Sequence, residues 1–253
     1  MRILITGASR GIGRAIAVAL AEPDRELHIH ARTAAALADT ADECRRAGTS
    51  PFLHEADLAD PAAAQRLADE VGDLDLLVNN AGVSGTEKAP WEITASEFET
   101  TLATNVLAPF ILTASAARSM LDRGGRIVDL SSGAAVTDSA NSADYWVSKT
   151  ALMRLGGSFH EAGHGRGLKV FEVAPGVVRT DMTAAMRMHD GRSDWTEISA
   201  VADIVAAIAR GELDGLAGTH IRAGTDDIDD LRARSAAGAA AGERRLRLTP
   251  WHD

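Results

Sequence analysis

The sequence predicts a doubly wound α/β fold, a parallel sheet of about seven strands flanked by helices. Short apolar segments alternate with segments of helical period as far as residue 224, and a glycine-rich turn joins the first strand to the first helix. Strands and helices that alternate in this way pair in parallel through right-handed crossovers, with helices on both faces. A chain of 253 residues suits one such domain better than two.

The individual elements follow from local pattern and from helix-end chemistry. Predicted strands lie at residues 2–6, 26–31, 51–56, 74–79, 126–131, 169–173 and 219–222. Predicted helices lie at residues 11–21, 33–47, 61–71, 95–121, 143–161 and 200–210. Asp60, directly before a proline, is an N-cap signal, and Thr94 with Glu97 fits a capping box. Gly48 and Gly211 stand where the preceding helices should end.

The last segment, residues 225–253, departs from this alternation, so we expect a single domain at 1–224 and an atypical C-terminal helix and tail. An acidic run at 226–230 is followed by alanine and glycine, and then by arginines at 244–247. We favour an exposed helix with a frayed end. The alternative is a subunit contact made by a tail with opposite charge at its two ends.

Composition narrows the class of protein. Lysine and arginine total 26 against 36 aspartate and glutamate, a formal net charge of −10, which disfavours partners such as nucleic acid or an anionic membrane. Cys44 is the one cysteine, so an intrachain disulfide and a cysteine-cluster metal site are excluded. No apolar run approaches the roughly 18 residues that span a bilayer, and the start lacks signal-peptide chemistry. We therefore expect a cytoplasmic protein.

The turn after the first strand, TGASRGIG at residues 6–13, is suited to a dinucleotide. Glycines let a diphosphate approach the N–H groups of a helix N-terminus, where the partial positive charge favours an anion. Helix packing also needs glycine, but the position after the first strand favours a cofactor site. The residues expected to hold the cofactor here are Gly7, Ser9, Arg10, Gly11, Ile12 and Gly13.

The end of the second strand indicates which dinucleotide binds. A carboxylate there would bond a ribose 2′-hydroxyl, whereas arginine suits a 2′-phosphate. The chain has Arg32 and no carboxylate at that place, and Arg10 lies inside the glycine turn. Guanidinium pairs well with phosphate. The sequence therefore favours NADP(H) over NAD(H), with two ordinary surface arginines as the alternative.

The single tyrosine, Tyr145, lies four residues before Lys149, so both fall on one face of a helix. An ammonium at that distance favours phenolate over phenol. Such a tyrosine can give a proton to a carbonyl oxygen or take one from an alcohol. Taken alone, the pair is more commonly a surface contact.

Five motifs occur in one order, namely the glycine turn, Asn79-Asn80-Ala81-Gly82, Ser131-Ser132, Tyr145 with Lys149, and Pro175-Gly176. In this order they resemble the compact, single-domain branch of the short-chain dehydrogenase/reductase family, over residues 1 to about 224. The resemblance implies the Rossmann form of the fold. It also implies an oxidoreductase that interconverts a carbonyl and a secondary alcohol by hydride transfer.

The resemblance assigns roles to individual residues. Tyr145 is the proton donor and acceptor, Lys149 binds ribose and activates the tyrosine, and Ser132, 13 residues before the tyrosine, orients the substrate. Tyr145 and Lys149 also contact the cofactor. Further implied cofactor contacts are Asp57 at adenine, Leu58 beside it, Asn80 along the ribose, and Val178 and Thr180 at the carboxamide.

Asn105 is the family's fourth catalytic position, and Pro109 adds a physical argument for it. Proline has no N–H and cannot bond the carbonyl four residues back, which is that of Asn105. We therefore predict a bend at Asn105 and a free carbonyl that holds a proton-relaying water. The alternative is a kink that only lets the helix curve around the sheet, with the polar groups of Asn105 hydrogen-bonded to a neighbouring residue.

Two other functions compete with this one. His160, Glu161 and His164 match H-E-x-x-H, the helix motif of zinc hydrolases, but glycines at 163, 165 and 167 should end the helix there and no third ligand follows. We therefore expect no metal. A protein that binds NADP(H) as a sensor without turnover is the other alternative, although binding alone does not need a proton donor.

Substrate and assembly are less defined. Residues 181–199 should cover the nicotinamide, and Met182, Met186, Met188 and Trp195 give this loop an apolar side, although they suit a cap on the sheet equally well. The resemblance implies a homo-oligomer built through the helices that carry Asn105 and Tyr145. A tetramer or a dimer fits, because the tail departs from the family's usual ending.

Overall fold

The computed structural model describes residues 1–184, 186, 191–240 and 242–248. Within them one parallel sheet has the strand order β3-β2-β1-β4-β5-β6-β7. The strands are β1 (Arg2–Ile5), β2 (Glu26–Ala31), β3 (Phe52–Glu55), β4 (Leu76–Asn79), β5 (Gly125–Leu130), β6 (Leu168–Ala174) and β7 (His220–Arg222). The predicted doubly wound α/β fold is confirmed. The order reverses between β1 and β4, where a crevice for a ligand forms in such sheets.

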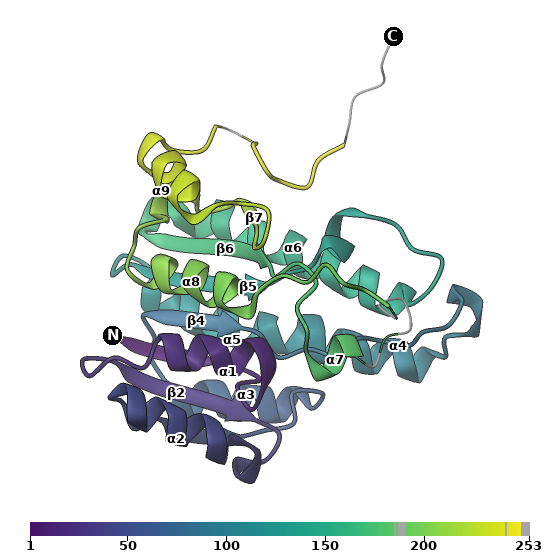
Figure 1. Cartoon of the computed structure of the whole chain (residues 1–253), viewed down its shortest axis with the longest axis horizontal. Coiled ribbons are helices and arrows are strands. Elements are labelled where there is room, and N and C mark those ends of the chain that lie inside the picture. The colour runs from purple at the N-terminus through teal and green to yellow at the C-terminus, as the bar shows by residue number, and fades with distance from the viewer. Residues whose placement is uncertain (185, 187–190, 241, 249–253) are drawn as a thin grey trace.

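Helices cover both faces of the sheet (Figure 1). They are α1 (Gly11–Ala19), α2 (Ala38–Ala47), α3 (Pro61–Val71), α4 (Ala95–Leu102), α5 (Ala108–Met120), α6 (Ala143–Gly163), α7 (Asp181–Ala184), α8 (Ile198–Ala209) and α9 (Ile228–Ala237). One core contains Ile16 of α1 and Val205 of α8, and the other contains Leu67 of α3 and Leu112 of α5. Each amphipathic helix therefore buries its apolar side against one face of the sheet.

The predicted helix starts are present. The side chain of Asp60 accepts a hydrogen bond from Ala62 N at the start of α3. Thr94 and Glu97 form the expected capping box at the start of α4. Gly48 adopts a left-handed conformation with φ of 118° directly after α2, which explains why glycine ends that helix.

The segment predicted as one helix at 95–121 is divided into α4, a π-helical segment at Ala103–Leu107, and α5. Where the sequence predicts a bend at Asn105, the structure has this π-helical segment, and Pro109, one turn beyond Asn105, removes an N–H from the α-helical pattern.

The same stretch, Ala95–Met120, has 26 residues and contains an 18-residue window of mean hydropathy 1.3, so by length and composition it is apolar enough to cross a membrane. The expectation that no apolar run approaches that length was wrong, because alanines among the valine, leucine, isoleucine and phenylalanine residues outweigh the few polar residues in the mean hydropathy of the window. Core helices pass the same test, and Leu112 and Ala116 of α5 pack in the second core.

The C-terminal segment is tied to the domain. Leu231 of α9 is buried, and Ser235 Oγ accepts a hydrogen bond from Gly215 N over 3.0 Å. The N–H of His220 on β7 bonds to the carbonyl of Arg244 over 2.9 Å. The Arg244 guanidinium forms an ion pair with Asp226. The opposite charges of this tail therefore meet within one chain. The expected exposed helix is α9, whereas the expected frayed end at 249–253 lies outside the described residues.

Candidate active site

The glycine turn after β1 packs closely against the turn after β4 and is hydrogen-bonded to it. Gly7 has φ of 65°, and a Cβ there would lie 2.8 Å from Ala81 Cα. The Asn80 side-chain amide donates to the carbonyls of Thr6 and Gly7 over 2.8 and 3.0 Å. A Cβ at Gly13 would lie 2.3 Å from Gly7 O, so only glycine fits the first turn of α1. The side chain of Asn80, expected along the ribose, thus holds this turn in place.

His30 supports the same turn and was not predicted to do so. Its Nδ1 accepts a hydrogen bond from Gly7 N over 3.3 Å, and its Nε2 lies 3.0 Å from Ala56 O. These partners fix the tautomer with the proton on Nε2. Burial lowers the pKa of His30, which keeps the ring neutral and Nδ1 an acceptor. A histidine near the end of the strand that neighbours the glycine turn was the available signal.

The N-terminus of α1 suits a diphosphate. Arg10 is its N-cap, in extended conformation, with no side-chain capping bond and no acidic residue in the first turn. The free N–H groups of such a terminus bind anions. Gly11 has φ of 56°, and a Cβ there would lie 3.3 Å from Thr180 Cγ2, so the loop after β6 closes over this turn. Arg10 forms an exposed ion pair with Asp181 across 3.1 Å.

The other expected cofactor residues lie near the carboxyl ends of their strands. Arg32 is exposed directly after β2, and Asp57 is exposed after β3, where its Oδ1 accepts from Ala59 N over 3.0 Å. Leu58 is buried beside it, and Val178 is buried after β6, where it pairs with Thr196. Ser9 and Ile12 are half-buried in the glycine turn.

Tyr145 and Lys149 lie on one face of α6, as predicted. The Lys149 amine is 5.8 Å from the centre of the Tyr145 ring and donates a hydrogen bond to Leu130 O over 2.8 Å. Lys149 is only 7% exposed. This bond fixes the amine at the end of β5, one strand away from the switch between β1 and β4.

Ser132 follows β5 and begins a short 3₁₀ turn at Gly133–Val136, where its Oγ accepts from Ala134 N over 3.1 Å. The Thr150 hydroxyl donates to Ala135 O over 3.1 Å and joins this turn to α6. Ser132 is half-buried. The structure therefore places Ser132 on a turn that is bonded directly to the helix carrying Tyr145.

Asn105 is buried in the π-helical segment and bridges two parts of the site. Its side chain exchanges two bonds of 2.9 Å with the backbone of Val83 and donates to Ser148 Oγ over 3.0 Å. A Cβ at Gly82 would lie 3.2 Å from Asn105 Oδ1 and 3.9 Å from Lys149 Nζ. Asn105, Gly82 and Lys149 thus gather at one place. The water relay at the Asn105 carbonyl stays a prediction.

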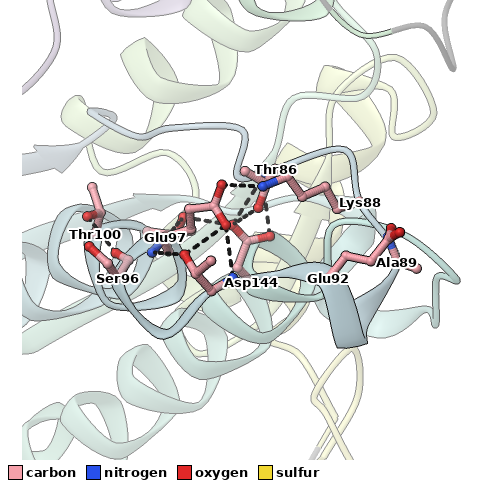
Figure 2. Close-up of polar contacts among 10 residues, drawn as sticks. Thr86, Lys88, Ala89, Glu92, Ser96, Glu97, Thr100 and Asp144 are labelled. Atoms are coloured by element: carbon pink, nitrogen blue, oxygen red, sulfur yellow. Dashed lines mark hydrogen bonds and ion pairs between the residues drawn. The ribbon is translucent and has the colours of Figure 1, made fainter.

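Asp144, next to Tyr145, holds the start of α6 in place through hydrogen bonds, a role that the sequence did not predict (Figure 2). Its carboxylate is fully buried and accepts from Thr86 N, Thr86 Oγ1 and Thr101 Oγ1 over 3.0, 3.1 and 2.9 Å. A Cβ at Gly85 would lie 2.6 Å from its Oδ1. These bonds tie the first turn of α6 to α4 and to the loop after β4, and so fix the position of Tyr145. An acid beside the lone tyrosine was the available signal.

Beside Asp144, an ion pair secures the same loop (Figure 2). Lys88 Nζ lies 2.5 Å from Glu97 Oε1. The bond from Lys88, with those from Thr94, lowers the pKa of Glu97 to about 2. The loop after β4 is therefore attached to α4 as well as to α6.

The zinc-hydrolase arrangement is not assembled. His160 and His164 stack with ring centres 4.9 Å apart, and His164 Nδ1 donates to His160 O over 3.0 Å. Glu161 forms an ion pair with Arg245, and α6 ends at Gly163 as predicted. Within the described ranges no three His, Cys, Asp or Glu side chains are arranged to hold a metal.

The expected substrate loop is defined in part. The Arg179 guanidinium lies 5.1 Å from the centre of the Trp195 ring, whose Nε1 donates to Arg192 O over 2.9 Å. Met182 is exposed on α7, and Met186 is half-buried. Met188 lies outside the described residues. An apolar inner face of this loop therefore stays a prediction.

Comparisons with known proteins agree with this geometry. The model of the short chain dehydrogenase family matches residues 1–191. The 3-oxoacyl-(acyl-carrier-protein) reductase FabG of Staphylococcus aureus is 33% identical over 189 residues, covering 72% of this chain and 76% of the relative. The FabG of Escherichia coli is 32% identical over 185 residues, covering 72% and 75%.

Solved structures agree as well. The angucycline C-6 ketoreductase LanV with bound NADP has a TM-score of 0.77 and 33% identity, over 87% of this chain and 93% of that one. A protein described as a putative NAD(P)-dependent gluconate 5-dehydrogenase from Beutenbergia cavernae, with NADP bound at low occupancy, has a TM-score of 0.81 and 30% identity, over 87% and 94%. This chain belongs to the short-chain dehydrogenase/reductase family of oxidoreductases.

Proposed function

We propose that this protein is an NADP(H)-dependent oxidoreductase that interconverts a carbonyl and a secondary alcohol, with Tyr145 as proton donor and acceptor. The observation that carries the proposal is the buried Lys149 amine, 5.8 Å from the Tyr145 ring and bonded to the end of β5. The glycine turn, which suits a diphosphate, lies two strands away in the same sheet.

The chemistry follows from the groups at this end of the sheet. The hydroxyls of Ser132 and Tyr145 hold the substrate oxygen, and Tyr145 gives it a proton during reduction or removes one during oxidation. The Lys149 charge stabilises the negative charge that develops on the phenol oxygen. Nicotinamide, when bound, supplies or accepts the hydride. Asn105 and Asp144 hold the surrounding loops and α6 in position.

The preference for NADP(H) is supported by the charge after β2. Arg32 is exposed there, and the residues that directly follow β2 in the sequence include no carboxylate to bond a ribose 2′-hydroxyl. Arg10 is engaged by Asp181, so Arg32 is the better-placed partner for a 2′-phosphate. LanV and the Beutenbergia cavernae protein have NADP bound.

We also propose a homo-oligomer formed through the helices that carry Asn105 and Tyr145. Large apolar side chains are exposed there, among them Leu107, Phe110 and Val147. A dimer and a tetramer both fit. The single-domain organisation over 1–224 and the cytoplasmic location stay predictions.

The test is a panel of ketones and aldehydes with NADPH carrying deuterium at the transferable position. We expect loss of NADPH absorbance and deuterium on the carbonyl carbon of the alcohol product. NADPH binding without label transfer to any member of the panel would favour the sensor and contradict the enzyme.

A further inference from the structure

The turn after β2 receives a carboxylate from the neighbouring strand. Ala31, the last residue of β2, is paired in register with Glu55, the last residue of β3. The Oε2 atom of Glu55 accepts a hydrogen bond from Ala34 N over 2.9 Å. The Glu55 side chain is exposed. A negative charge from β3 is therefore held on the short segment that begins with Arg32.

The segment itself offers no acceptor for this N–H. Ala34 begins a 3₁₀ turn, Ala34–Leu37, and the N-cap residue Thr33 is extended and makes no side-chain capping bond. The first N–H groups of a helical turn have no partner within the turn. Glu55 supplies the missing acceptor from 21 positions further along the chain. The carboxylate of one strand thus caps the turn that follows the neighbouring strand.

Arg32 lies at the same turn and keeps its own charge available. The Cα atoms of Arg32 and Ala34, two residues apart in the sequence, are separated by at most about 7.6 Å. Arg32 is exposed, and within the part of the chain that the structure describes its guanidinium forms no ion pair. A ligand that reaches this turn therefore meets a guanidinium and a carboxylate that do not neutralise each other by contact.

The turn after β2 is also attached to the glycine turn, where the diphosphate is expected. Ala8 N donates to the carbonyl of His30 over 2.8 Å, and the Thr40 hydroxyl on α2 donates to Ala8 O over 2.9 Å. In folds of this kind the end of the second strand meets the adenosine ribose, where an acid bonds a 2′-hydroxyl and an arginine accommodates a 2′-phosphate. Here the structure brings one group of each kind to that place.

We propose that Glu55 is a specificity-determining residue for the cofactor, because its carboxylate repels the 2′-phosphate that Arg32 attracts. Glu55 thereby limits the preference for NADP(H) and leaves NAD(H) able to compete. This role rests on the proposed function, in which the dinucleotide occupies the glycine turn. A phosphate monoester carries about 1.5–2 negative charges at neutral pH. A carboxylate about 7 Å away in water of low salt therefore lowers its affinity several-fold.

A purely structural cap would behave differently from a charge. A cap that only orders the turn affects the binding of both cofactors alike. A charge acts on the cofactor that carries the 2′-phosphate, and its effect fades as salt screens it, since the Debye length falls from about 30 Å at 0.01 M to about 3 Å at 1 M. The comparison of two cofactors at two salt concentrations therefore separates the two roles.

The test measures Kd for NADPH and NADH by fluorescence titration in wild type and Glu55→Gln. Glutamine keeps an acceptor for Ala34 N and removes the charge. At about 0.01 M ionic strength we expect NADPH to bind about three- to tenfold more tightly than to wild type, with NADH within about twofold. At about 1 M the gain for NADPH should disappear. Unchanged NADPH affinity at low salt, or an equal gain for both cofactors, overturns the proposal.

Glu92→Gln is the matched control. The Glu92 carboxylate also accepts a bond from a backbone N–H at a 3₁₀ turn, that of Ala89 over 3.2 Å, but in the loop after β4. Its removal should leave both Kd values unchanged. A gain in NADPH affinity in Glu92→Gln as large as in Glu55→Gln would show that the net charge of the protein, and not the position of Glu55, sets the preference, and would overturn the proposal.

A second measurement isolates the adenosine end of the cofactor. Adenosine 2′,5′-bisphosphate and AMP differ only in the 2′-phosphate, so calorimetric titration gives the ratio of their Kd values without turnover. Both Glu55→Gln and Glu55→Ala should shift this ratio about three- to tenfold toward the bisphosphate at low salt, because the charge and not the hydrogen bond decides it. An unchanged ratio contradicts the role of Glu55 even in an active enzyme. Failure of the proposed function shows separately, as a wild type that binds neither NADPH nor NADH, and overturns both.

Discussion

The side-chain amide of Asn105 donates a hydrogen bond to Ser148 Oγ over 3.0 Å, one residue before Lys149. The same side chain bonds both backbone groups of Val83 in the loop after β4. The Ser148 hydroxyl in turn donates to Tyr145 O over 2.7 Å. The π-helical segment, the loop after β4 and the first turns of α6 are therefore joined through one buried amide.

Replacing Asn105 by Ala should lower the free energy of unfolding by about 1–3 kcal/mol, because the buried Ser148 hydroxyl and both backbone groups of Val83 lose a hydrogen-bond partner. Turnover should fall as well, since α6 loses its connection to the loop. Denaturant unfolding and steady-state kinetics check both. Asn141→Ala, in an exposed loop before α6, is the matched control. An Asn105→Ala protein as stable and active as this control would contradict the bridge.

Arg32→Ala should weaken NADPH binding about 10- to 150-fold and leave NADH binding unchanged, because a charge-assisted bond to phosphate is worth about 1.5–3 kcal/mol. Arg10→Ala is the matched comparison, since Asp181 already engages that guanidinium, and its effect should be smaller. Fluorescence titration with both cofactors gives the Kd values. If Arg32→Ala lost the same factor of affinity for NADPH and for NADH, a role of Arg32 in recognising the 2′-phosphate would be contradicted.

Gly156→Ala should destabilise the protein by about 1–3 kcal/mol, because the new methyl group would meet the Glu172 carboxyl at 2.1 Å. A methyl group at the adjacent Gly157 would have no heavy atom within 4 Å, so Gly157→Ala should stabilise the helix by about 0.5–1 kcal/mol. Thermal unfolding of the two variants separates these effects. If the Tm values of both variants changed in the same direction, the tight packing of Gly156 against Glu172 would be contradicted.

Asp129 should make stability depend on pH in a defined window. Burial raises the pKa of Asp129 from 3.8 to about 6. A carboxyl group whose pKa rises on folding lowers the stability of the folded protein at every pH above the pKa that the group has in the unfolded chain. The cost is absent below about pH 4 and complete above about pH 6. The Tm of Asp129→Asn relative to wild type should therefore rise as the pH increases from 4 to 7. The predicted change is up to about 3 kcal/mol in free energy, and a constant difference across this range would be the contrary result.

Elements with a clear period or a clear end signal could be predicted from the sequence. The strands, α3 behind Asp60, and the irregularity before Pro109 belong to this group, because capping and the missing proline N–H act locally. The helix α9 could not be placed in the same way, since its contact with Gly215 depends on residues 20 positions earlier in the chain.

The motif residues of the site could be predicted because their chemistry is carried by residue type and spacing. The supporting residues could not. His30 bonds to Gly7 from a neighbouring strand, and Asp144 is bonded by Thr86, 58 positions away. The paired acids Asp129 and Glu172 meet only because β5 and β6 are in register. Nothing in the local sequence distinguishes such acids from exposed ones.

The most direct test of the central claim is turnover by Tyr145→Phe at saturating substrate and cofactor. The variant removes the one phenolic hydroxyl and keeps the ring, so we expect kcat to fall about 10²–10⁴-fold, the usual contribution of a positioned proton donor. The Kd for NADPH should remain that of wild type. A kcat within about twofold of wild type would show that Tyr145 does not transfer the proton and would contradict the account.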